Sequence, residues 1–307
     1  MKKQWLLMFV VVVMVMAVAA CGGEEEAETS AEESGGNGEN DPAVGNESGS
    51  VTIAGSSAMQ PLVGAAAEIY QEEEPEANIQ VQAGGSGAGL SQVAAEQVDI
   101  GNSDLFAEEE DEIDAGELVD HRVAVVGMAP VVHPDAGVDD LTSEELIDVW
   151  TGEITNWSEL GGADEEITLV NRPQSSGTRT TFVNHALHGE EPAEGITEDS
   201  SNTVRQIVSE TEGAIGYLAF SYFDDSITKV SIDGVEPTAE NVQTGEYPIW
   251  AYQHSYTHGE PQGLTKEFLD FMLSDEIQET LVPEQGYINV NQMEVERDAE
   301  GEETSVE

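Results

Sequence analysis

The sequence predicts an α/β fold with largely parallel sheets, because strand-like and helix-like segments alternate along most of the chain. Residues 51–54 form a short apolar run, and residues 79–82 alternate apolar and polar side chains as a strand does. Between them, residues 59–72 have a helical pattern with Pro61 in the first turn, where proline is tolerated. This alternation is typical of parallel sheets flanked by helices, and no internal repeat of solenoid period is present.

The same alternation continues to residue 281. Further strands are expected at 98–101, 123–132, 167–170, 214–217, 227–232 and 247–252. Further helices are expected at 90–97, 142–150, 175–187, 203–209, 264–273 and 274–281. The helix at 142–150 has the clearest start signal, because Thr142 and Glu145, three residues later, form a capping box.

The first 21 residues have the layout of a secretory signal that ends in a lipid-modified cysteine. Two lysines precede an apolar stretch at residues 5–20, which is short for a membrane span of about 20 apolar residues. Small residues stand directly before Cys21, the sole cysteine, and this arrangement resembles a bacterial lipobox. We therefore expect an extracytoplasmic protein that is anchored to the cell membrane through lipid on Cys21. A single cysteine also excludes an intrachain disulfide.

Composition separates a folded region from two polar segments. Residues 22–50 consist mainly of Gly, Glu, Ser, Asn and Ala, and such a segment cannot bury enough apolar surface to offset its ordering entropy. We expect it to be a disordered acidic linker. The folded region would then run from residue 51 to about 295, and an acidic, frayed tail would occupy residues 296–307.

The charge of the chain is strongly negative. Nine Lys and Arg stand against 63 Asp and Glu, for a net charge of −54, and loss of Lys2 and Lys3 with the signal makes it more negative still. Nucleic acid is thereby excluded as a partner, because binding its phosphate backbone needs a basic surface. Such a chain repels itself unless salt screens it. Our hypothesis is a halophilic acidic protein, and the alternative is a surface that binds calcium.

Three turns share one arrangement, in which a strand ends, hydroxyl or glycine residues follow, and a helix begins. They lie at residues 56–58, 85–87 and 176–178. A helix start presents unpaired backbone N–H groups and the positive end of the helix dipole. Each turn alone is equally an ordinary helix cap. Three such turns at the carboxyl ends of strands, where α/β folds bind ligands, indicate an anion site.

Two charged residues refine the expected ligand. Arg172 follows the strand at 167–170, and its guanidinium could donate to two oxygens of a tetrahedral oxyanion, although a surface ion pair is the alternative. Asp104 follows the strand at 98–101. Because an ionised carboxylate only accepts hydrogen bonds, it favours an anion that carries a proton, such as HPO₄²⁻, over sulfate. On pattern alone, a cap or turn role for Asp104 is the simpler interpretation.

At these residues the sequence resembles the phosphate-binding proteins of bacterial and archaeal phosphate ABC importers, in the type II solute-binding class. The resemblance covers nearly all of residues 51–291. The matching segments are VTIAGSSAMQPL (51–62), AGGSGAGL (83–90), DIGNSD (99–104), LTSEELIDVWTGEITNWSELGG (141–162), VNRPQSSGTRTTF (170–182) and EGAIGYLAF (212–220). The family's ligand residues, carried over position by position, fall on Ser57, Ala58 (through its backbone N–H), Ser86, Asp104, Arg172, Ser176, Gly177 and Thr178. The pattern departs at Ala58, where some members have an aromatic residue, and at Ser175, where glycine is common.

The resemblance also implies an architecture and a function. It implies two lobes, each a mostly parallel sheet flanked by helices, which are joined by two crossing strands and close on the ligand by a hinge. Lobe 1 would comprise residues 51–124 and 255–295, and lobe 2 residues 125–254. The implied function is high-affinity extracytoplasmic capture of inorganic phosphate and its delivery to the permease subunits of a membrane ABC importer. We expect a monomer without cofactor or metal.

Other functions fit the sequence less well. A receptor for sulfate or molybdate would have the same fold, but Asp104 argues against it. An extracellular sensor or adhesive protein is a further alternative that sequence alone leaves open. A phosphatase-type enzyme would need Ser176 as nucleophile with a histidine base, yet neither a GxSxG elbow nor an HExxH motif is present.

The histidines that could serve as such a base have simpler interpretations. His121 and His133 flank the strand at 123–132, and we expect them only to cap it. His185 and His188 follow the turn at 176–178 on the same helix, and we expect both on the surface.

Overall fold

The computed structural model of this protein describes residues 49–110 and 112–306. The predicted signal with Cys21, and the linker as far as residue 48, lie outside these residues. Among the residues that are described, no helix combines the length and apolarity needed to cross a membrane.

A nine-stranded mixed sheet organises the fold. Its spatial order is β2 (Ala77–Ala83), β1 (Gly49–Gly55), β3 (Ile100–Ser103), β11 (Trp250–His258), β4 (Leu118–Val132), β8 (Ala214–Ala219), β6 (Thr168–Asn171) and β7 (Ile196–Thr197), with β9 (Thr228–Lys229) on β4 beside this path. The strands at each end of the sheet pair in parallel, as β1 does with β2 and β3, and as β6 does with β7 and β8. The α/β class predicted from the alternation of elements is therefore confirmed.

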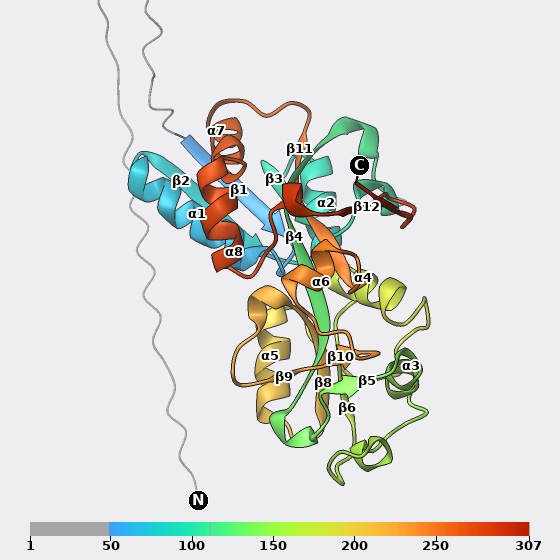
Figure 1. Cartoon of the computed structure of the whole chain (residues 1–307). Helices are drawn as coiled ribbons and strands as arrows, with labels where there is room; N and C mark the ends of the chain where they lie inside the picture. Colours follow the sequence, from blue (N-terminus) through green and yellow to red (C-terminus); the bar gives the residue numbers. More distant parts are fainter. Residues whose placement is uncertain (1–48, 111, 307) are drawn as a thin grey trace, which may run out of the picture. The chain divides into compact units, whose positions relative to one another are not determined.

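Two long antiparallel strands join the ends of the sheet. β4 and β11 pair with each other, β11 continues the pairing to β3, and β4 continues it to β8. Figure 1 shows β4 passing from the part that contains β1, β2 and β3 to the part that contains β6 and β8. We call these parts the first half (β1–β3 with α1, α2 and α7) and the second half (β6–β8 with α3, α4 and α5). β4 and β11 thus connect the first half to the second.

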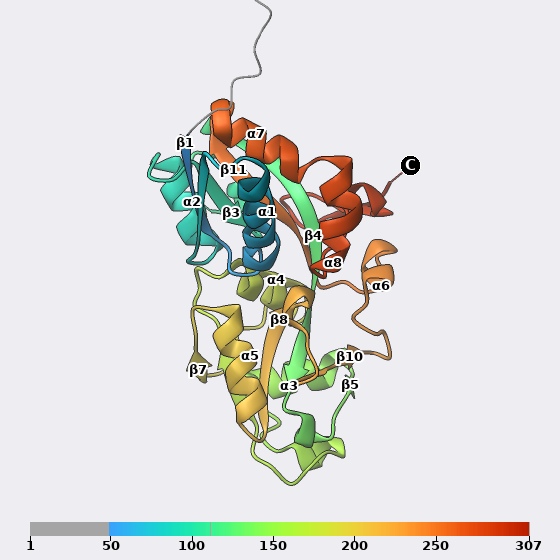
Figure 2. The ribbon, with the colours of Figure 1, turned by 90° about the vertical axis from the view of Figure 1, so that its left-hand side faces the viewer.

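Helices cover both halves of the sheet. Those of the first half are α1 (Gln60–Glu73), α2 (Ser86–Ala94) and α7 (Gly263–Met272), and those of the second are α3 (Ser143–Thr151), α4 (Gly177–His185) and α5 (Ser201–Glu210). α1 and α7 contact each other, whereas α2 contacts β3 and β11, and α5 contacts β8 and β6. Figure 2 shows α1 in front of the first half and α5 beside β8 in the second. The short helices α6 (Ala239–Gln243) and α8 (Val282–Glu284) follow later in the chain.

The remaining elements are short. Two small sheets stand apart from the main one, β5 (Asp140–Leu141) with β10 (Ser231–Ile232), and β12 (Val295–Arg297) with β13 (Glu303–Ser305). A π-helix spans Ile277–Leu281, and 3-10 turns lie at Ala107–Glu109, Ala115–Glu117, Pro134–Ala136, Trp157–Leu160, Phe220–Tyr222 and Val290–Gln292.

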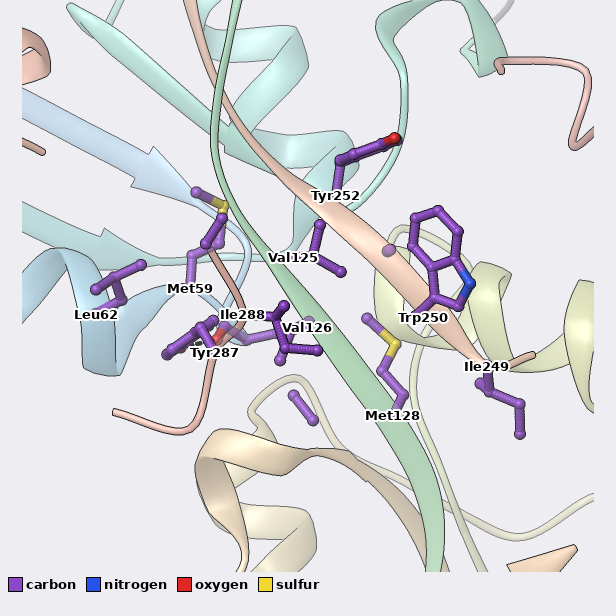
Figure 3. Close-up of a cluster of buried hydrophobic side chains, with 14 of the residues drawn as sticks. Met59, Leu62, Val125, Val126, Met128, Ile249, Trp250, Tyr252, Tyr287 and Ile288 are labelled. Carbon is purple, nitrogen blue, oxygen red and sulfur yellow. Dashed lines mark hydrogen bonds between the residues drawn. The ribbon is translucent and has the colours of Figure 1, made fainter. Parts of the chain in front are cut away.

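The main hydrophobic core continues from one half into the other along β4 and β11. Figure 3 shows Val125, Met128 and Trp250 on these two strands, packed with Met59 of the first half and Ile288 near the C-terminus. In the second half Phe182 stacks on Tyr217 with ring centroids 4.4 Å apart, and both contact Trp150. This packing places the start of α4 against β8, where the predicted anion-binding turn lies.

Several elements differ from the sequence-based expectation. α2 begins at Ser86 rather than at residue 90, because the glycine run itself opens the helix. The strand expected at 227–232 divides at Val230 into β9 and β10, which pair with different partners. The helix expected at 274–281 is largely a π-helix. By contrast, the capping box of α3 is confirmed, since Thr142 Oγ1 accepts from the Glu145 N–H at 3.2 Å and Glu145 accepts from the Thr142 N–H at 2.9 Å.

The acidic tail also differs, because it forms a hairpin where a frayed segment was expected. β12 and β13 pair in antiparallel register between Val295 and Ser305. Arg297 is buried and donates to the carbonyl oxygens of Trp250 at 2.6 Å and Pro248 at 2.9 Å, with its guanidinium 4.1 Å from the centre of a Trp250 ring. One buried arginine thus attaches the tail to the start of β11.

Candidate functional site

The predicted turns meet between the two halves. All eight predicted ligand residues are buried: Ser57, Ala58, Ser86, Asp104, Arg172, Ser176, Gly177 and Thr178. Ser86 and Asp104 follow strands of the first half, whereas Arg172 and Thr178 belong to the second. Hydrogen bonds connect Asp104 with Ser86 and Thr178, and Arg172 with Ser57, so the structure brings members of the predicted set together across the two halves.

Asp104 lies at the centre of this arrangement. Its Oδ1 accepts from the Ser56 hydroxyl at 2.5 Å, and its Oδ2 accepts from the Thr178 hydroxyl at 2.9 Å. Its backbone N–H donates to Ser86 Oγ at 2.9 Å, and Gln253 Nε2 donates to Oδ1 at 3.2 Å. A carboxylate offers about four acceptor positions. Three donors therefore leave Asp104 able to accept one more hydrogen bond.

The electrostatics of Asp104 are set by its burial. Desolvation raises the pKa of Asp104 above its ordinary value, and the hydrogen bonds of Ser56 and Thr178 and the charge of Arg172 oppose this rise only in part. A second negative charge beside the ionised carboxylate would be unfavourable. A proton on the ligand would turn that repulsion into a hydrogen bond.

Arg172 supplies the positive charge of the site. It is 1% exposed, which is rare for an unpaired guanidinium, and its backbone N–H donates to the Tyr217 hydroxyl at 2.9 Å. Nε donates to the Glu198 carbonyl at 2.9 Å, and Nη2 donates to the Asp199 carbonyl at 2.8 Å. Burial lowers the pKa of Arg172 from its ordinary value. Two backbone carbonyls of one loop thus hold the guanidinium in place.

A pair of serine hydroxyls joins Arg172 to the first half. Arg172 Nη2 donates to Ser57 Oγ at 3.2 Å and Nη1 donates to Ser201 Oγ at 3.1 Å. The two hydroxyls are 3.0 Å apart, and the Ser201 N–H donates to Ser57 Oγ at 3.3 Å. Tyr222 adds a bond from its hydroxyl to the Ser57 carbonyl at 2.5 Å. The start of α1 therefore faces the start of α5 through Ser57.

Glycine is required where the halves approach most closely. A Cβ at Gly177 would lie 2.3 Å from Ser86 Oγ and 2.9 Å from the Asp104 Cβ. Gly85 has a positive φ of 87°, and a Cβ there would lie 3.0 Å from the Ser175 carbonyl oxygen. The Gly87 N–H donates to that same carbonyl at 3.1 Å. The helix starts of α2 and α4 are in backbone contact across the two halves.

Two predicted residues also make local bonds of the kind expected from the alternative interpretation. The Ser176 hydroxyl caps α4 by accepting from the Arg179 N–H at 3.3 Å. The Ala58 N–H, which the resemblance assigns to the ligand, donates to Ser56 Oγ at 3.0 Å. Ser176 keeps its own hydroxyl hydrogen for another acceptor, because the cap uses only the oxygen.

Sequence reasoning missed three residues of the site. Ser56 was passed over for Ser57, although both stand in the same turn. Ser201 opens α5 just after β7, so it carries the signal already used at the other turns and could have been found. Gln253 is in the middle of β11, where nothing in the local pattern indicates a polar role.

The four histidines singled out from the sequence take no part in the hydrogen bonds described above. His121 lies within β4, with its Nε2 3.2 Å from Thr257 Oγ1. His133 Nδ1 accepts from the Asp135 N–H at 3.1 Å, so it caps the 3-10 turn Pro134–Ala136 rather than the strand. His188 is exposed, as expected, but His185 is half-buried, and burial lowers its pKa to about 4.

A cavity of about 330 Å³ adjoins Asp104. Its walls come from the segment after β3, from α4, from the start of β11 and from the C-terminal hairpin, and they include Leu105, Phe106, Glu109, His185, Tyr252 and Arg297. It therefore reaches Asp104 from the side of the hairpin. Within the described ranges, no group of three or more His, Cys, Asp or Glu side chains could hold a metal ion.

Taken together, the geometry defines a binding site of a particular chemistry. Hydroxyl groups, backbone N–H groups at helix starts, one guanidinium and one carboxylate lie together where the two halves meet. Such a set suits a small tetrahedral oxyanion that carries a proton. The fold is that of a type II solute-binding protein.

Comparison with known proteins narrows this class to a family. A model of the PBP superfamily domain matches residues 39–276. The chain is 66% identical over 268 residues to the phosphate-binding protein PstS of Bacillus subtilis, covering 86% of this chain and 89% of that one. A PstS of Borreliella burgdorferi is 28% identical, covering 78% and 90%. The chain belongs to the PstS family of phosphate-binding proteins within the PBP superfamily.

Solved structures agree with this assignment. A substrate-binding protein of the phosphate ABC transporter type from Clostridium perfringens, solved with bound phosphate, matches with a TM-score of 0.74 at 34% identity, covering 79% of this chain and 100% of that one. An ABC-type phosphate transport receptor from Vibrio cholerae matches with a TM-score of 0.60 at 27% identity, covering 78% and 99%.

Proposed function

We propose that this protein captures inorganic phosphate outside the cytoplasm and delivers it to an ABC importer in the membrane. Phosphate fits the site because it offers acceptor oxygens to Arg172, Ser57 and Ser176, and a P–O–H hydrogen to Asp104. The relatives whose names or titles state phosphate binding and phosphate transport support the same ligand and the same partner.

The observation that carries the proposal is the buried carboxylate of Asp104 among donors. Asp104 is 4% exposed, and among the residues that the structure describes no charged side chain donates a hydrogen bond to it. A site built for sulfate or molybdate gains nothing from that acceptor, because those anions bring no proton at neutral pH. Selection for protonated oxyanions follows from the cost of an unpaired or repelled buried acceptor.

The two halves of the fold would act as lobes that close on the ligand. We place their boundaries in β4 and β11, so that residues 51–124 and 255–295 form lobe 1 and residues 125–254 form lobe 2. The course of both strands supports this division, because each boundary falls within a strand that crosses from half to half. Bending there would separate Ser57, Ser86 and Asp104 from Arg172, Ser176 and Thr178.

We further propose that the mature protein is a monomer held at the outer face of the membrane by lipid on Cys21, with residues 22–50 as a tether. A binding protein explains the site better than an enzyme does. Ser176 caps α4, and the histidine on its helix, His185, lines the neighbouring cavity and has a pKa of about 4. A hydrolase would need a base in contact with the nucleophile.

Retention of radiolabelled phosphate tests this function. Residues 22–307 would be dialysed in molar KCl against labelled phosphate, with unlabelled sulfate, molybdate or arsenate as competitor. We expect retention that arsenate reduces, because arsenate carries a proton, and that sulfate and molybdate leave unchanged. Arg172→Ala should abolish retention. If unlabelled sulfate displaced the labelled phosphate as effectively as unlabelled phosphate does, the protein would be a broader oxyanion receptor. Release of phosphate from organic esters would show an enzyme.

A further inference from the structure

Gln253 contacts the carboxylate of the site from the strand that joins the two halves. It is fully buried on β11, and its Nε2 donates to Asp104 Oδ1 at 3.2 Å and to the Tyr252 carbonyl at 3.1 Å. Its Oε1 is buried and has no hydrogen-bond partner among the described residues. An unpaired buried amide oxygen costs about 1–3 kcal/mol, so the amide orientation that leaves it unpaired requires a reason.

The reason lies in Asp104. If the amide were turned over, Oε1 would face Asp104 Oδ1, and two acceptors would lie in contact. That orientation becomes favourable only when Asp104 carries a proton and can donate it. The orientation with Nε2 on Oδ1 is therefore the one that matches an ionised Asp104.

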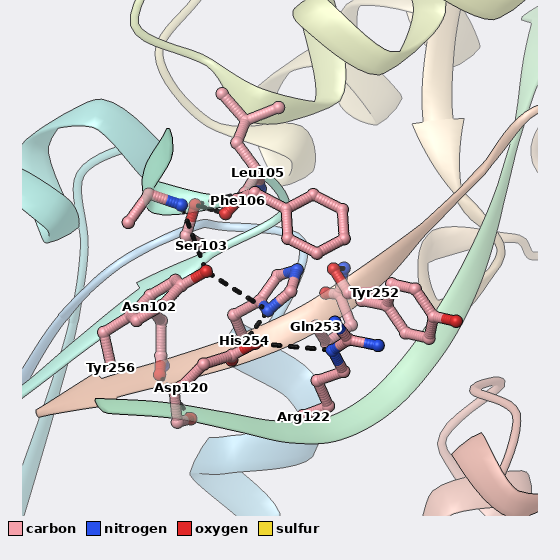
Figure 4. A network of polar contacts seen from close by, with 12 residues as sticks. Asn102, Ser103, Leu105, Phe106, Asp120, Arg122, Tyr252, Gln253, His254 and Tyr256 are labelled. Carbon is pink, nitrogen blue, oxygen red and sulfur yellow. Dashed lines mark hydrogen bonds and ion pairs between the residues drawn. The ribbon is translucent and has the colours of Figure 1, made fainter. Parts of the chain in front are cut away.

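A bulge on the neighbouring strand β4 lies directly beside this contact. In the pairing of β11 with β4, Gln253 lies opposite Ala124 and His254 lies opposite Arg122, so Val123 is left over as a bulge. A bulge redirects side chains locally and occurs often beside functional sites. The neighbouring His254 is also anchored, because its Nδ1 lies 2.8 Å from Asp120 Oδ1. Figure 4 shows Gln253 and His254 side by side on β11.

We propose that Gln253 is a specificity-determining residue of this site: it holds Asp104 aimed and ionised, so that oxyanions without a proton are rejected. The inference rests on the proposed phosphate function and deepens it. Gln253 acts through Asp104, so it is a positioning residue for the ligand. Without its N–H, Asp104 keeps only two hydroxyl donors, and the protonated form becomes more populated at a given pH.

A protonated Asp104 would change the selectivity of the site. A carboxylic acid donates a hydrogen bond, and sulfate accepts hydrogen bonds through all four of its oxygens. Loss of the Gln253 donor should therefore allow sulfate to bind at a pH where the native protein rejects it. Sulfate is the better reporter of this change, because it keeps one charge state throughout the range from about pH 5 to about pH 8, whereas phosphate does not.

Other groups near Asp104 are shared by every variant considered. The positive charge of Arg172 acts to lower the pKa of Asp104. Burial raises the pKa of Tyr222 to about 12 and that of Tyr287 above its ordinary value, so both stay neutral in this range. Burial likewise raises the pKa of Glu109, which lines the cavity next to Asp104. His254, the residue after Gln253, pairs with Asp120, and Arg122 forms an ion pair with the same carboxylate.

The test compares Gln253→Met with Gln278→Met. Gln278 is a matched control, because it is also buried, donates through Nε2 to the carbonyls of Val123 and Met272, and has an Oε1 without a partner among the described residues, yet its side chain makes no hydrogen bond to Asp104. Calorimetric titrations with phosphate and with sulfate would be run on residues 22–307 in molar KCl at several pH values. Gln253→Asn, which withdraws the amide by one methylene, serves as a second variant.

We expect Gln253→Met to weaken phosphate binding about tenfold, the effect of losing one hydrogen bond to a charged group. We also expect it to bind sulfate up to a higher pH than the native protein does. Gln278→Met should lower the melting temperature and keep the native selectivity. A Gln253→Met protein with native selectivity at every pH would overturn the proposal. So would failure of both Gln253 variants to fold while Gln278→Met folds. A native protein that binds no phosphate would instead refute the proposed function.

Discussion

Thr178 donates its hydroxyl hydrogen to Oδ2 of Asp104 over 2.9 Å, and this bond joins a helix start in the second half to a strand end in the first. The same carboxylate accepts from Ser56 and Gln253, which lie on the first half and on the joining strand. Asp104 is thus the point at which the first half, the second half and the joining strand β11 meet.

Thr178→Val should weaken phosphate binding about tenfold with little change in fold. The substitution keeps the shape of the side chain and removes one hydrogen bond to a buried carboxylate, an effect of about 1.5 kcal/mol. Thr180→Val is the matched control, because Thr180 lies on the same helix and its hydroxyl donates only locally, to the Ser176 carbonyl at 3.4 Å. Equal losses of affinity in the two variants, measured by calorimetry, would count against the role of Thr178.

Asp104→Asn should stabilise the protein at neutral pH in the absence of phosphate. Burial raises the pKa of Asp104, so the folded protein binds this proton more tightly than the unfolded chain does. The associated stability is present below the ordinary pKa of about 3.9 and is lost as the pH rises through the raised value. The free energies of unfolding of the native protein and of Asp104→Asn should therefore be similar in acid. As the pH rises, the variant should become the more stable of the two. Urea unfolding at several pH values measures this difference, and a native advantage near pH 7 would contradict it.

Gly177→Ala should abolish tight binding while leaving each half folded. Its Cβ would lie 2.3 Å from Ser86 Oγ, so the halves could not approach as they do in this structure. Gly64→Ala is the control, because Gly64 lies within α1 with nothing within 4 Å of the added carbon. That control should gain about 0.5–1 kcal/mol of stability and bind phosphate normally. Normal phosphate affinity in Gly177→Ala would show that close approach at this point is dispensable.

Asp120→Asn should make stability less sensitive to acid. Burial alone would raise the pKa of Asp120, but the hydrogen bond and charge of His254 and the charge of Arg122 outweigh it and hold the pKa below its ordinary value. Stability from this group is present above the unfolded pKa of about 3.9 and is lost as the pH falls through the lower folded value. At neutral pH the substitution should cost about 1.5–3 kcal/mol, the range for a hydrogen bond to a charged group. If urea unfolding showed the same loss of stability in acid for the native protein and for Asp120→Asn, the proposed contribution of the Asp120–His254 pair would be wrong.

Salt should stabilise this chain strongly. A net charge of −54 makes the folded state repel itself, and screening at molar KCl shortens the range of that repulsion to about 3 Å. The urea midpoint should therefore rise steadily from low salt to molar KCl, with or without a chelator. A midpoint that rises only with added calcium would favour the alternative of a calcium-binding surface.

The fold and much of the site were predictable from the sequence because their signals are local. Strand ends followed by Gly, Ser or Thr and a helix start identified the turns of Ser57, Ser86 and Ser176, and Asp104 and Arg172 stand at strand ends of the same kind. Ser201 carries that signal too, and only its weak two-residue strand concealed it.

Other features depend on distant partners and so left no local pattern. Gln253 lies within a buried strand, and its role arises from its hydrogen bond to Asp104, which is far away in the sequence. The C-terminal hairpin reads as a polar tail, because its order comes from the bonds of Arg297 to the carbonyls of Trp250 and Pro248. Polar composition alone predicts fraying at such a segment.

The most direct test of the central claim is calorimetry of phosphate and sulfate binding to the native protein and to Asp104→Asn. Residues 22–307 would be freed of bound anion by partial unfolding and titrated in molar KCl near neutral pH. We expect the native protein to bind phosphate tightly and sulfate not at all. We expect Asp104→Asn to lose this discrimination. Equal binding of both anions by the native protein, or unchanged discrimination in the variant, would contradict it.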